Sequence, residues 1–231
     1  MPPIDIPARD MAARLQGYVD RVDTYEVAGV KYFRVVDYKT GKKDFDYCDV
    51  FNGVGLQMLL YLFALEQEGE KLMGDRRIAA GVQYFPARVP YISLDGAEES
   101  EEKDRRANWK RRGLLLNDEL SLVAMDPEEG MPRLSCKRKK DGTLSGDLAD
   151  RDQLKLLRQY VFSVLGRMVD EIASGKVEAN PYTRGSGHDA CAFCPYGTIC
   201  HKECVEGRRN YKTMTPQRFW EEIQQEVKPR G

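Results

Sequence analysis

Two strand-like runs near the N-terminus constrain the fold of this chain most. Residues 14–27 and 30–39 both have the pattern of extended structure, and only Ala28 and Gly29 separate them. A link this short joins neighbouring antiparallel strands. The second run ends in the letters VVDYKTG and is apolar on both faces near its end, which is typical of a central strand. We therefore predict a sheet in which this run is covered on both sides.

The rest of the chain alternates between helical and strand-like patterns and predicts one α/β domain. The expected elements are a buried helix over 49–66, a strand over 78–86 with a possible extension over 89–94, a charged helix over 98–112, a loop or hairpin insertion over 126–147, an amphipathic helix over 151–174 and a short helix over 216–226. Gly175 is the expected stop of the long helix. Its apolar stripe consists of Leu154, Leu157, Val161, Val164, Met168 and Ile172.

Composition and charge place the chain among globular proteins. It has 231 residues, 42% of them hydrophobic and 32% charged, with a net charge of −1. Basic clusters at 103–112 and 137–140 are the exceptions to this balance, and each alone is typical of a solvated surface. The longest apolar run, 54–65, is too short to span a bilayer, and the N-terminus lacks the pattern of a signal peptide. We expect a cytoplasmic protein, in which cysteines serve as metal ligands more often than as disulfides.

An acidic and a basic side chain share one face of the second strand. Side chains alternate along a strand, so Asp37 and Lys39 point to the same side as Phe33 and Val35. Alone, such a pair is typical of an ion pair at a strand end. Asp20 changes this interpretation, because a hairpin of the two runs would bring it close to Asp37. Two carboxylates suit Mg²⁺ or Mn²⁺, and an adjacent ammonium can orient a water or stabilise charge on a phosphate.

Gln57 and Tyr61 are four residues apart and would share one face of the 49–66 helix, with Val50 and Val54 above them. A glutamine in so apolar a helix needs hydrogen-bond partners. It is either a satisfied core residue or a group that faces the site, and its position directly after the acidic strands favours the site.

The segments GYVDRVD, VVDYKTG and QMLLY, in that order, resemble the RecB-like nucleases of the PD-(D/E)XK superfamily. The likeness is strongest to the nuclease domain of AddB-type subunits in bacterial helicase–nuclease complexes. The resemblance implies a restriction-endonuclease-like α/β core with a mixed central sheet flanked by helices, and a metal-dependent deoxyribonuclease of the exonuclease type. It implies an AddA-type partner subunit and the cutting of single-stranded DNA ends during double-strand-break repair.

The same resemblance implies roles for individual residues. Asp20 and Asp37 match the acids that bind the divalent metal, and the backbone carbonyl of Tyr38 is a further ligand. Lys39 matches the catalytic lysine. Gln57 and Tyr61 match the motif that follows, whereas Asp23 points to the other strand face and is interpreted as structural. A non-catalytic DNA-binding or scaffold module with a structural metal site is the alternative function.

Four cysteines and a histidine follow the long helix. Cys191, Cys194 and Cys200 form a C-x2-C-x5-C pattern that can supply most of a tetrahedral metal site. The resemblance implies a [4Fe-4S] cluster whose fourth cysteine lies upstream of the nuclease motifs, but none of the nineteen residues before Asp20 is a cysteine. Cys204 is the first substitute and His201 the second, and Zn²⁺ is the competing metal.

The remaining cysteines and the domain limits complete the expectations. Cys48 and Cys136 have no motif partners and are interpreted as incidental. The usual helices before the first acidic strand have almost no counterpart here, so the chain has the pattern of a trimmed domain. We expect a nuclease core over 1–176 and a cysteine-rich metal-binding lobe over 177–231.

Overall fold

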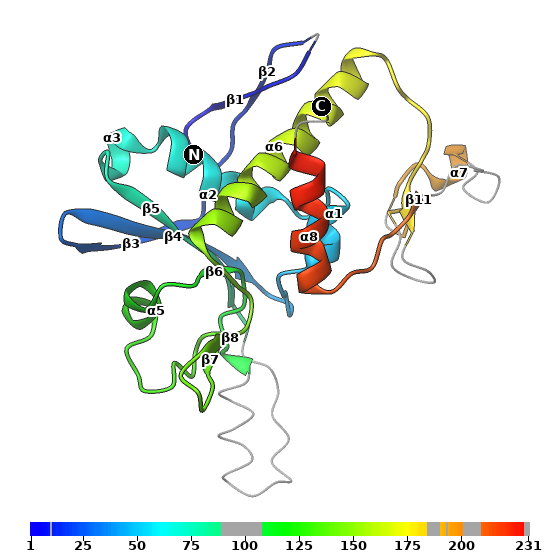
Figure 1. The fold of residues 1–231 in the computed structure, drawn as a ribbon. Helices are drawn as coiled ribbons and strands as arrows, with labels where there is room; N and C mark the ends of the chain where they lie inside the picture. Colours follow the sequence, from blue (N-terminus) through cyan, green and yellow to red (C-terminus); the bar gives the residue numbers. More distant parts are fainter. Residues whose placement is uncertain (10, 89–107, 184–189, 193, 201–208, 229–231) are drawn as a thin grey trace, which may run out of the picture.

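The computed structural model describes residues 1–9, 11–88, 108–183, 190–192, 194–200 and 209–228. Its centre is a five-stranded mixed sheet with the order β3-β4-β5-β6-β9 (Figure 1). Its strands are β3 (Arg21–Val27), β4 (Val30–Lys39), β5 (Arg77–Pro86), β6 (Leu115–Leu116) and β9 (Leu148–Ala149). β4 pairs with β3 in antiparallel and with β5 in parallel orientation, so β4 is a central strand as predicted.

The hairpin of β3 and β4 confirms the predicted link. Ala28 and Gly29 have φ angles of 50° and 71°, as a tight two-residue turn of the primed type requires. The first run is not one strand over 14–27, however. It divides into β2 (Ala13–Leu15), which pairs with β1 (Ile4–Ile6), and β3. The break falls at Gly17, where the chain passes close to another element and leaves the sheet.

The predicted helix over 49–66 is also two helices, α1 (Tyr47–Phe51) and α2 (Gln57–Glu68). Gly53 and Gly55, between them, have φ angles of 75° and 67°, a left-handed conformation that a continuous helix cannot contain. Val50 is buried, whereas Val54 is 40% exposed, so the predicted stack of valines above Gln57 is wrong. The turn matters for the site because it places the start of α2, and not its middle, beside the strands.

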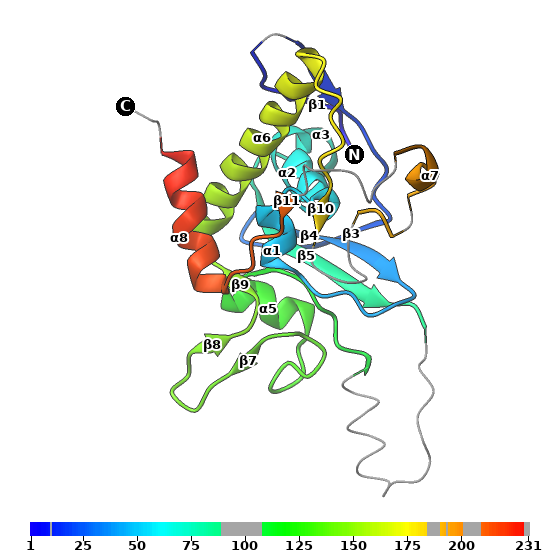
Figure 2. The ribbon, with the colours of Figure 1, turned by 90° about the vertical axis from the view of Figure 1, so that its right-hand side faces the viewer.

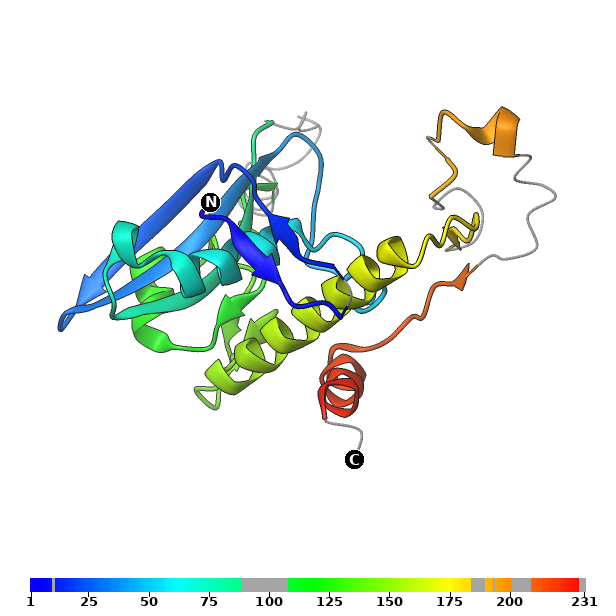
Figure 3. The ribbon, with the colours of Figure 1, turned by 90° about the horizontal axis from the view of Figure 1, so that it is seen from above.

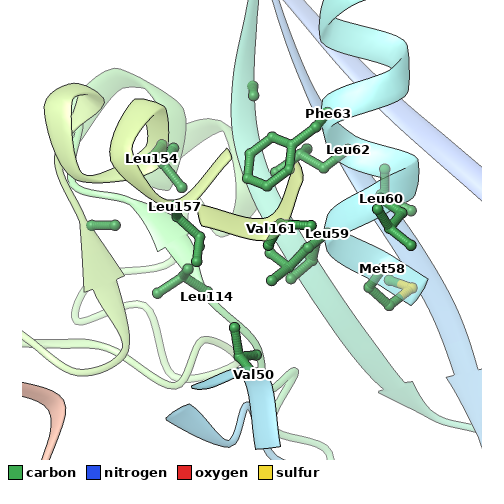
Figure 4. Close-up of a cluster of buried hydrophobic side chains, with 14 of the residues drawn as sticks. Val50, Met58, Leu59, Leu60, Leu62, Phe63, Leu114, Leu154, Leu157 and Val161 are labelled. Carbon is green, nitrogen blue, oxygen red and sulfur yellow. The ribbon is translucent and has the colours of Figure 1, made fainter. Parts of the chain in front are cut away.

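The core lies between the sheet and the helices that cover it. Leu59, Leu62 and Phe63 of α2 meet Leu157 and Val161 of α6 (Arg151–Ala173) in the interior (Figure 4). A capping box between Asp150 and Gln153 begins α6, and Gly175, with φ 71°, follows its end as predicted. The first four residues of the predicted stripe are buried, but Met168 and Ile172 are 39% and 68% exposed because α6 extends past the core.

Two further elements pack on α6. The helix α8 (Pro216–Val227), predicted over 216–226, buries Phe219 and Ile223 completely and lies alongside α6 (Figure 2). The hairpin of β1 and β2 lies along another side of the same helix (Figure 3), where Ile4 and Ile6 join a small cluster with Phe162. Both ends of the described chain are thus fixed to one helix.

The other expectations are resolved as follows. The third strand is confirmed as β5, and the insertion over 126–147 contains the hairpin of β7 (Lys137–Arg138) and β8 (Leu144–Ser145). The extension over 89–94 and most of the helix over 98–112 lie outside the described residues. Arg112 pairs with Tyr84 as an extended residue, so the helix does not reach it. None of the described helices is long and apolar enough to cross a membrane.

The short elements are α3 (Glu70–Met73), α5 (Glu119–Met125), α7 (Gly197–Cys200), β10 (Tyr182–Thr183) and β11 (Arg209–Asn210). β10 and β11 pair in parallel, and α7 lies outside the layers formed by the sheet and its helices (Figures 1 and 3).

Candidate active site

The acid and the lysine at the end of β4 lie on the same side of the sheet, as predicted. Lys39 Nζ lies 2.6 Å from Asp37 Oδ2, and the two side chains are 38% and 14% exposed. Phe33 and Val35, on the same face, are in the core. Asp37 Oδ2 is buried and accepts no aligned hydrogen bond from any described residue, so its contact with Lys39 is an ion pair. The strand therefore carries a carboxylate from the apolar core to the edge of the solvent, with one cation beside it.

Asp20 directly precedes β3, and its position follows from the register of the hairpin. The last pair is Arg21 with Val36, so the next positions along the two strands place Asp20 opposite Asp37. Asp20 is exposed. The structure thus brings the two predicted acids to the same end of the hairpin.

Asp23 lies on the other face and has structural partners. Arg21 Nε and Arg34 Nη2 donate hydrogen bonds to it over 2.5 Å and 2.8 Å. Burial opposes ionisation of Asp23, but the hydrogen bonds from the two guanidinium groups hold its pKa below the usual value. Arg21 also donates to the hydroxyl of Tyr38 over 2.7 Å, so the side chain of Tyr38 belongs to this opposite network. These contacts agree with the interpretation of Asp23 as structural.

Gln57 and Tyr61 lie together at the start of α2. Gln57 Nε2 donates to the Tyr61 hydroxyl over 2.8 Å, and Gln57 is exposed, which excludes the alternative of a core glutamine. Tyr61 packs against the segment that leads to Asp20: a Cβ built on Gly17 would lie 3.0 Å from Tyr61 Cε1. Gly17 therefore permits the close approach that its position in the first run predicted.

Two residues near Asp37 were not identified from the sequence. Tyr84 is the partner of Asp37 in the register of β4 and β5, and it is 7% exposed. Burial, together with the negative charges of Asp37 and Asp49, raises the pKa of the Tyr84 hydroxyl to about 12. Asp49 of α1 is the second missed residue. The parallel pairing that brings Tyr84 here joins segments far apart in the sequence, so no local pattern signals it.

Asp49 connects this region to the C-terminal part of the chain. Its side chain is 15% exposed, forms an ion pair with Lys43 at 3.7 Å and accepts a hydrogen bond from the Tyr211 hydroxyl. Neighbouring contacts follow the same direction, because Met214 N donates to Cys48 Sγ over 3.3 Å. Asn52 also exchanges hydrogen bonds with the backbone of residue 212. Cys48 is therefore part of the attachment of 211–214 to α1, which corrects its interpretation as incidental.

The cysteine segment is described only in part. Cys191 is half-buried, Cys194 and Cys200 are exposed, and the Cys194 amide donates to the Cys191 carbonyl over 3.2 Å in a turn. His201 and Cys204, the predicted fourth ligands, lie outside the described residues. Within the part that is described, no group of three or more His, Cys, Asp or Glu side chains could hold a metal ion. Cys136 is buried in a separate cluster, and burial raises the pKa of its thiol.

Comparison with known proteins links this geometry to a family. A model of the PD-(D/E)XK nuclease superfamily matches residues 3–201. Similar curated proteins include three that are named as AddB-type subunits of an ATP-dependent helicase/deoxyribonuclease. The one from Clostridium kluyveri is 34% identical over 92% of this chain, the one from Acetivibrio thermocellus 35% over 87%, and the one from Symbiobacterium thermophilum 32% over 96%. The matched region is 19%, 18% and 20% of these relatives, so the chain spans about a fifth of their length.

Proposed function

Because the chain belongs to the PD-(D/E)XK nuclease superfamily, we propose that it is a divalent-metal-dependent nuclease domain that hydrolyses DNA phosphodiester bonds. The observation that carries this proposal is the pair of Asp37 and Lys39 on the core-facing side of β4, 2.6 Å apart. The register that sets Asp20 opposite Asp37 supports it. So does the hydrogen-bonded pair of Gln57 and Tyr61 beside the segment leading to Asp20.

The donors at this place fit Mg²⁺ or Mn²⁺. Asp20, Asp37 and the backbone carbonyl of Tyr38 would hold the ion, and all three supply hard oxygen ligands. Magnesium sites commonly combine one or two carboxylates with waters and substrate phosphates, so a third acidic side chain is not needed. The buried Asp37 Oδ2, which accepts no aligned hydrogen bond within the described part, is an oxygen with capacity for a cation. When bound, such an ion lowers the pKa of a water and neutralises charge on the phosphate.

The residues of the chain itself then have separate tasks. Lys39 holds its ammonium beside Asp37, where it can orient the attacking water and donate a hydrogen bond to a phosphate oxygen. Gln57 and Tyr61 line the site, and their mutual hydrogen bond fixes the orientation of both polar ends. Asp23, Arg21 and Arg34 hold the hairpin from the opposite face.

The relatives' names extend the proposal to a larger assembly. We propose that the domain works in a helicase–nuclease complex of the AddB type with an AddA-type partner, in the bacterial cytoplasm. Its substrates would be single-stranded DNA ends, cut exonucleolytically during double-strand-break repair. Within the chain, 1–176 would form the nuclease core. The segment 177–231 would carry Cys191, Cys194, Cys200 and Cys204 around a [4Fe-4S] cluster or Zn²⁺.

The test is cleavage of a labelled single-stranded DNA with Mg²⁺ or Mn²⁺ by the chain and by Asp20→Asn, Asp37→Asn and Lys39→Ala variants. Each substitution should lower the rate by about 10²–10³-fold, the usual cost of removing one group that stabilises the transition state. Asp23→Asn is the matched control, since it removes a nearby carboxylate on the other face and should retain most of the activity of correctly folded protein. Unchanged cleavage in the Asp37→Asn variant would refute the assignment. DNA binding without any metal-dependent cleavage would favour the non-catalytic module.

The cysteine proposal has its own measurement. Chain purified without oxygen should show the visible absorbance of an iron–sulfur cluster and contain iron and sulfide. Stoichiometric zinc without iron would replace the cluster by a Zn²⁺ site.

A further inference from the structure

A cleft of about 360 Å³ opens next to Lys39 at the ends of β4 and β5. This volume is within the usual range of ligand sites. Half of the residues that line it are cationic: Lys39, Lys42, Lys43, Arg88, Lys110 and Arg112. The described lining includes no acidic residue. The chain as a whole has a net charge of −1, so this concentration of one sign is local.

Neighbouring acids neutralise only part of this charge. Lys43 pairs with Asp49 at 3.7 Å, and Arg112 pairs with Asp44 at 2.5 Å. Lys39 is engaged with Asp37, as described above. Three other cations of the cleft have no acidic partner among the residues that the structure describes, namely Lys42, Arg88 and Lys110. A concave surface lined by one sign of charge focuses its field and attracts ligands of the opposite sign.

The cleft is continuous with the candidate active site. Lys39 belongs to both, and Tyr84, the partner of Asp37 in the sheet, also lines the cleft. Its floor is fixed by the sheet, where the Ala87 amide donates to the Lys39 carbonyl over 2.8 Å. At Gly41 the wall is open, since a Cβ built there meets nothing within 4 Å. A chain of phosphates with one phosphate at Lys39 would therefore have its next phosphates within the cationic cleft.

We propose that this cleft binds the phosphodiester backbone of the DNA strand beside the bond to be cut, and this rests on the proposed nuclease function. Lysine and arginine neutralise phosphates without reading bases, so the binding is independent of sequence. The role of the cleft is to position the strand. Lys42 and Lys110, which come from separate segments of the lining, each neutralise a backbone phosphate.

The test measures binding separately from cleavage. A fluorescent single-stranded oligonucleotide is titrated with the full chain in the absence of divalent metal, by anisotropy, over a series of salt concentrations. For single strands, each neutralised phosphate contributes about 0.7 to the slope of log K against log salt. Lys42→Ala/Lys110→Ala should therefore reduce the slope by about 1.4 relative to the unsubstituted chain.

A matched control removes the same charge elsewhere. Lys71 and Lys155 are exposed lysines of α3 and α6 that do not line the cleft, and the Lys71→Ala/Lys155→Ala variant should keep the original slope. Equal slopes for the two double variants would overturn the proposal. Gly41→Asp is an independent variant, because the open wall accommodates the side chain while a carboxylate enters the cleft. It should weaken binding at least as much as one lysine removal, and unweakened binding would count against the cleft.

The outcomes for the cleft and for the nuclease are distinguishable. If the slope depends on Lys42 and Lys110 but the unsubstituted chain cuts no DNA with metal, the cleft proposal stands as a nucleic-acid site and the nuclease proposal fails. If the chain cuts DNA while both double variants bind alike, the nuclease stands and the cleft proposal fails.

Discussion

Tyr84 should make the stability of the chain depend on alkaline pH. Its ring is 7% exposed, and burial followed by the charges of Asp37 and Asp49 raises its pKa to about 12. A tyrosine in the unfolded chain loses its proton near pH ~10. The contribution of Tyr84 to stability is thus fully present below pH ~10. It is lost as the pH rises toward about 12, because the unfolded state releases its proton first.

The size of the effect follows from the two pKa values. At pH ~11 the unfolded tyrosine is about nine-tenths ionised and the native one about one-tenth. Linkage then gives a loss of about 1.4 kcal/mol in the free energy of unfolding relative to pH ~8. Tyr84→Phe has no such proton and should lose about 1.4 kcal/mol less over the same interval. Urea denaturation at the two pH values, followed by circular dichroism, measures both losses.

Two further variants make this measurement specific. Tyr18→Phe removes a tyrosine that is 89% exposed and should behave like the unsubstituted chain. Asp49→Asn removes one of the two negative charges that add to burial, so its pH-dependent loss should lie between those of the unsubstituted chain and Tyr84→Phe. Equal losses in the unsubstituted chain and in Tyr84→Phe would refute the reasoning, because Tyr84 would then titrate as it does in the unfolded chain.

Three predictions concern the packing that supports the site. Phe219→Ala should cost about 3–5 kcal/mol of unfolding free energy in urea, since the ring is fully buried, and Leu72→Ala, at a residue 70% exposed, should cost far less. Gly113→Ala should lose much of the native β-sheet circular dichroism, because its Cβ would overlap the Val82 carbonyl oxygen; an unchanged spectrum and melting temperature would contradict this. Tyr160→Phe should cost about 1–3 kcal/mol, because its hydroxyl donates over 2.6 Å to the buried carbonyl that ends α1, and a neutral result would mean that this carbonyl finds another donor.

Local patterns predicted the parts of the site that depend on one element. The alternation of side chains along a strand was enough to place Asp37 and Lys39 on one face, and the two-residue link was enough to predict the hairpin. Gln57 and Tyr61 were predicted as a pair because four residues make one turn of a helix. The superfamily followed from the order of these motifs, and the matching family model confirms it.

Other features depended on information that no local pattern contains. Apolar content predicted burial over 49–66, but the left-handed conformation of Gly53 and Gly55 divides that segment into two helices. Tyr84 reaches Asp37 through a parallel pairing of segments about fifty positions apart. The register between such strands is set by the packing of the whole sheet. The roles assigned to the site residues and the limits of the two predicted domains stay predictions.

The attachment of 211–214 to α1 has a consequence for how this region opens. Five residues are too few for a helix that persists alone, so α1 depends on its tertiary contacts. Several of these come from a segment about 160 positions later, through Cys48, Asp49 and Asn52. Local unfolding of the two segments is therefore one cooperative event, and their amides should exchange with deuterated solvent at a common rate. A ligand that orders the neighbouring cysteine segment would slow that exchange in α1 and so extend the lifetime of the closed state around Asp49.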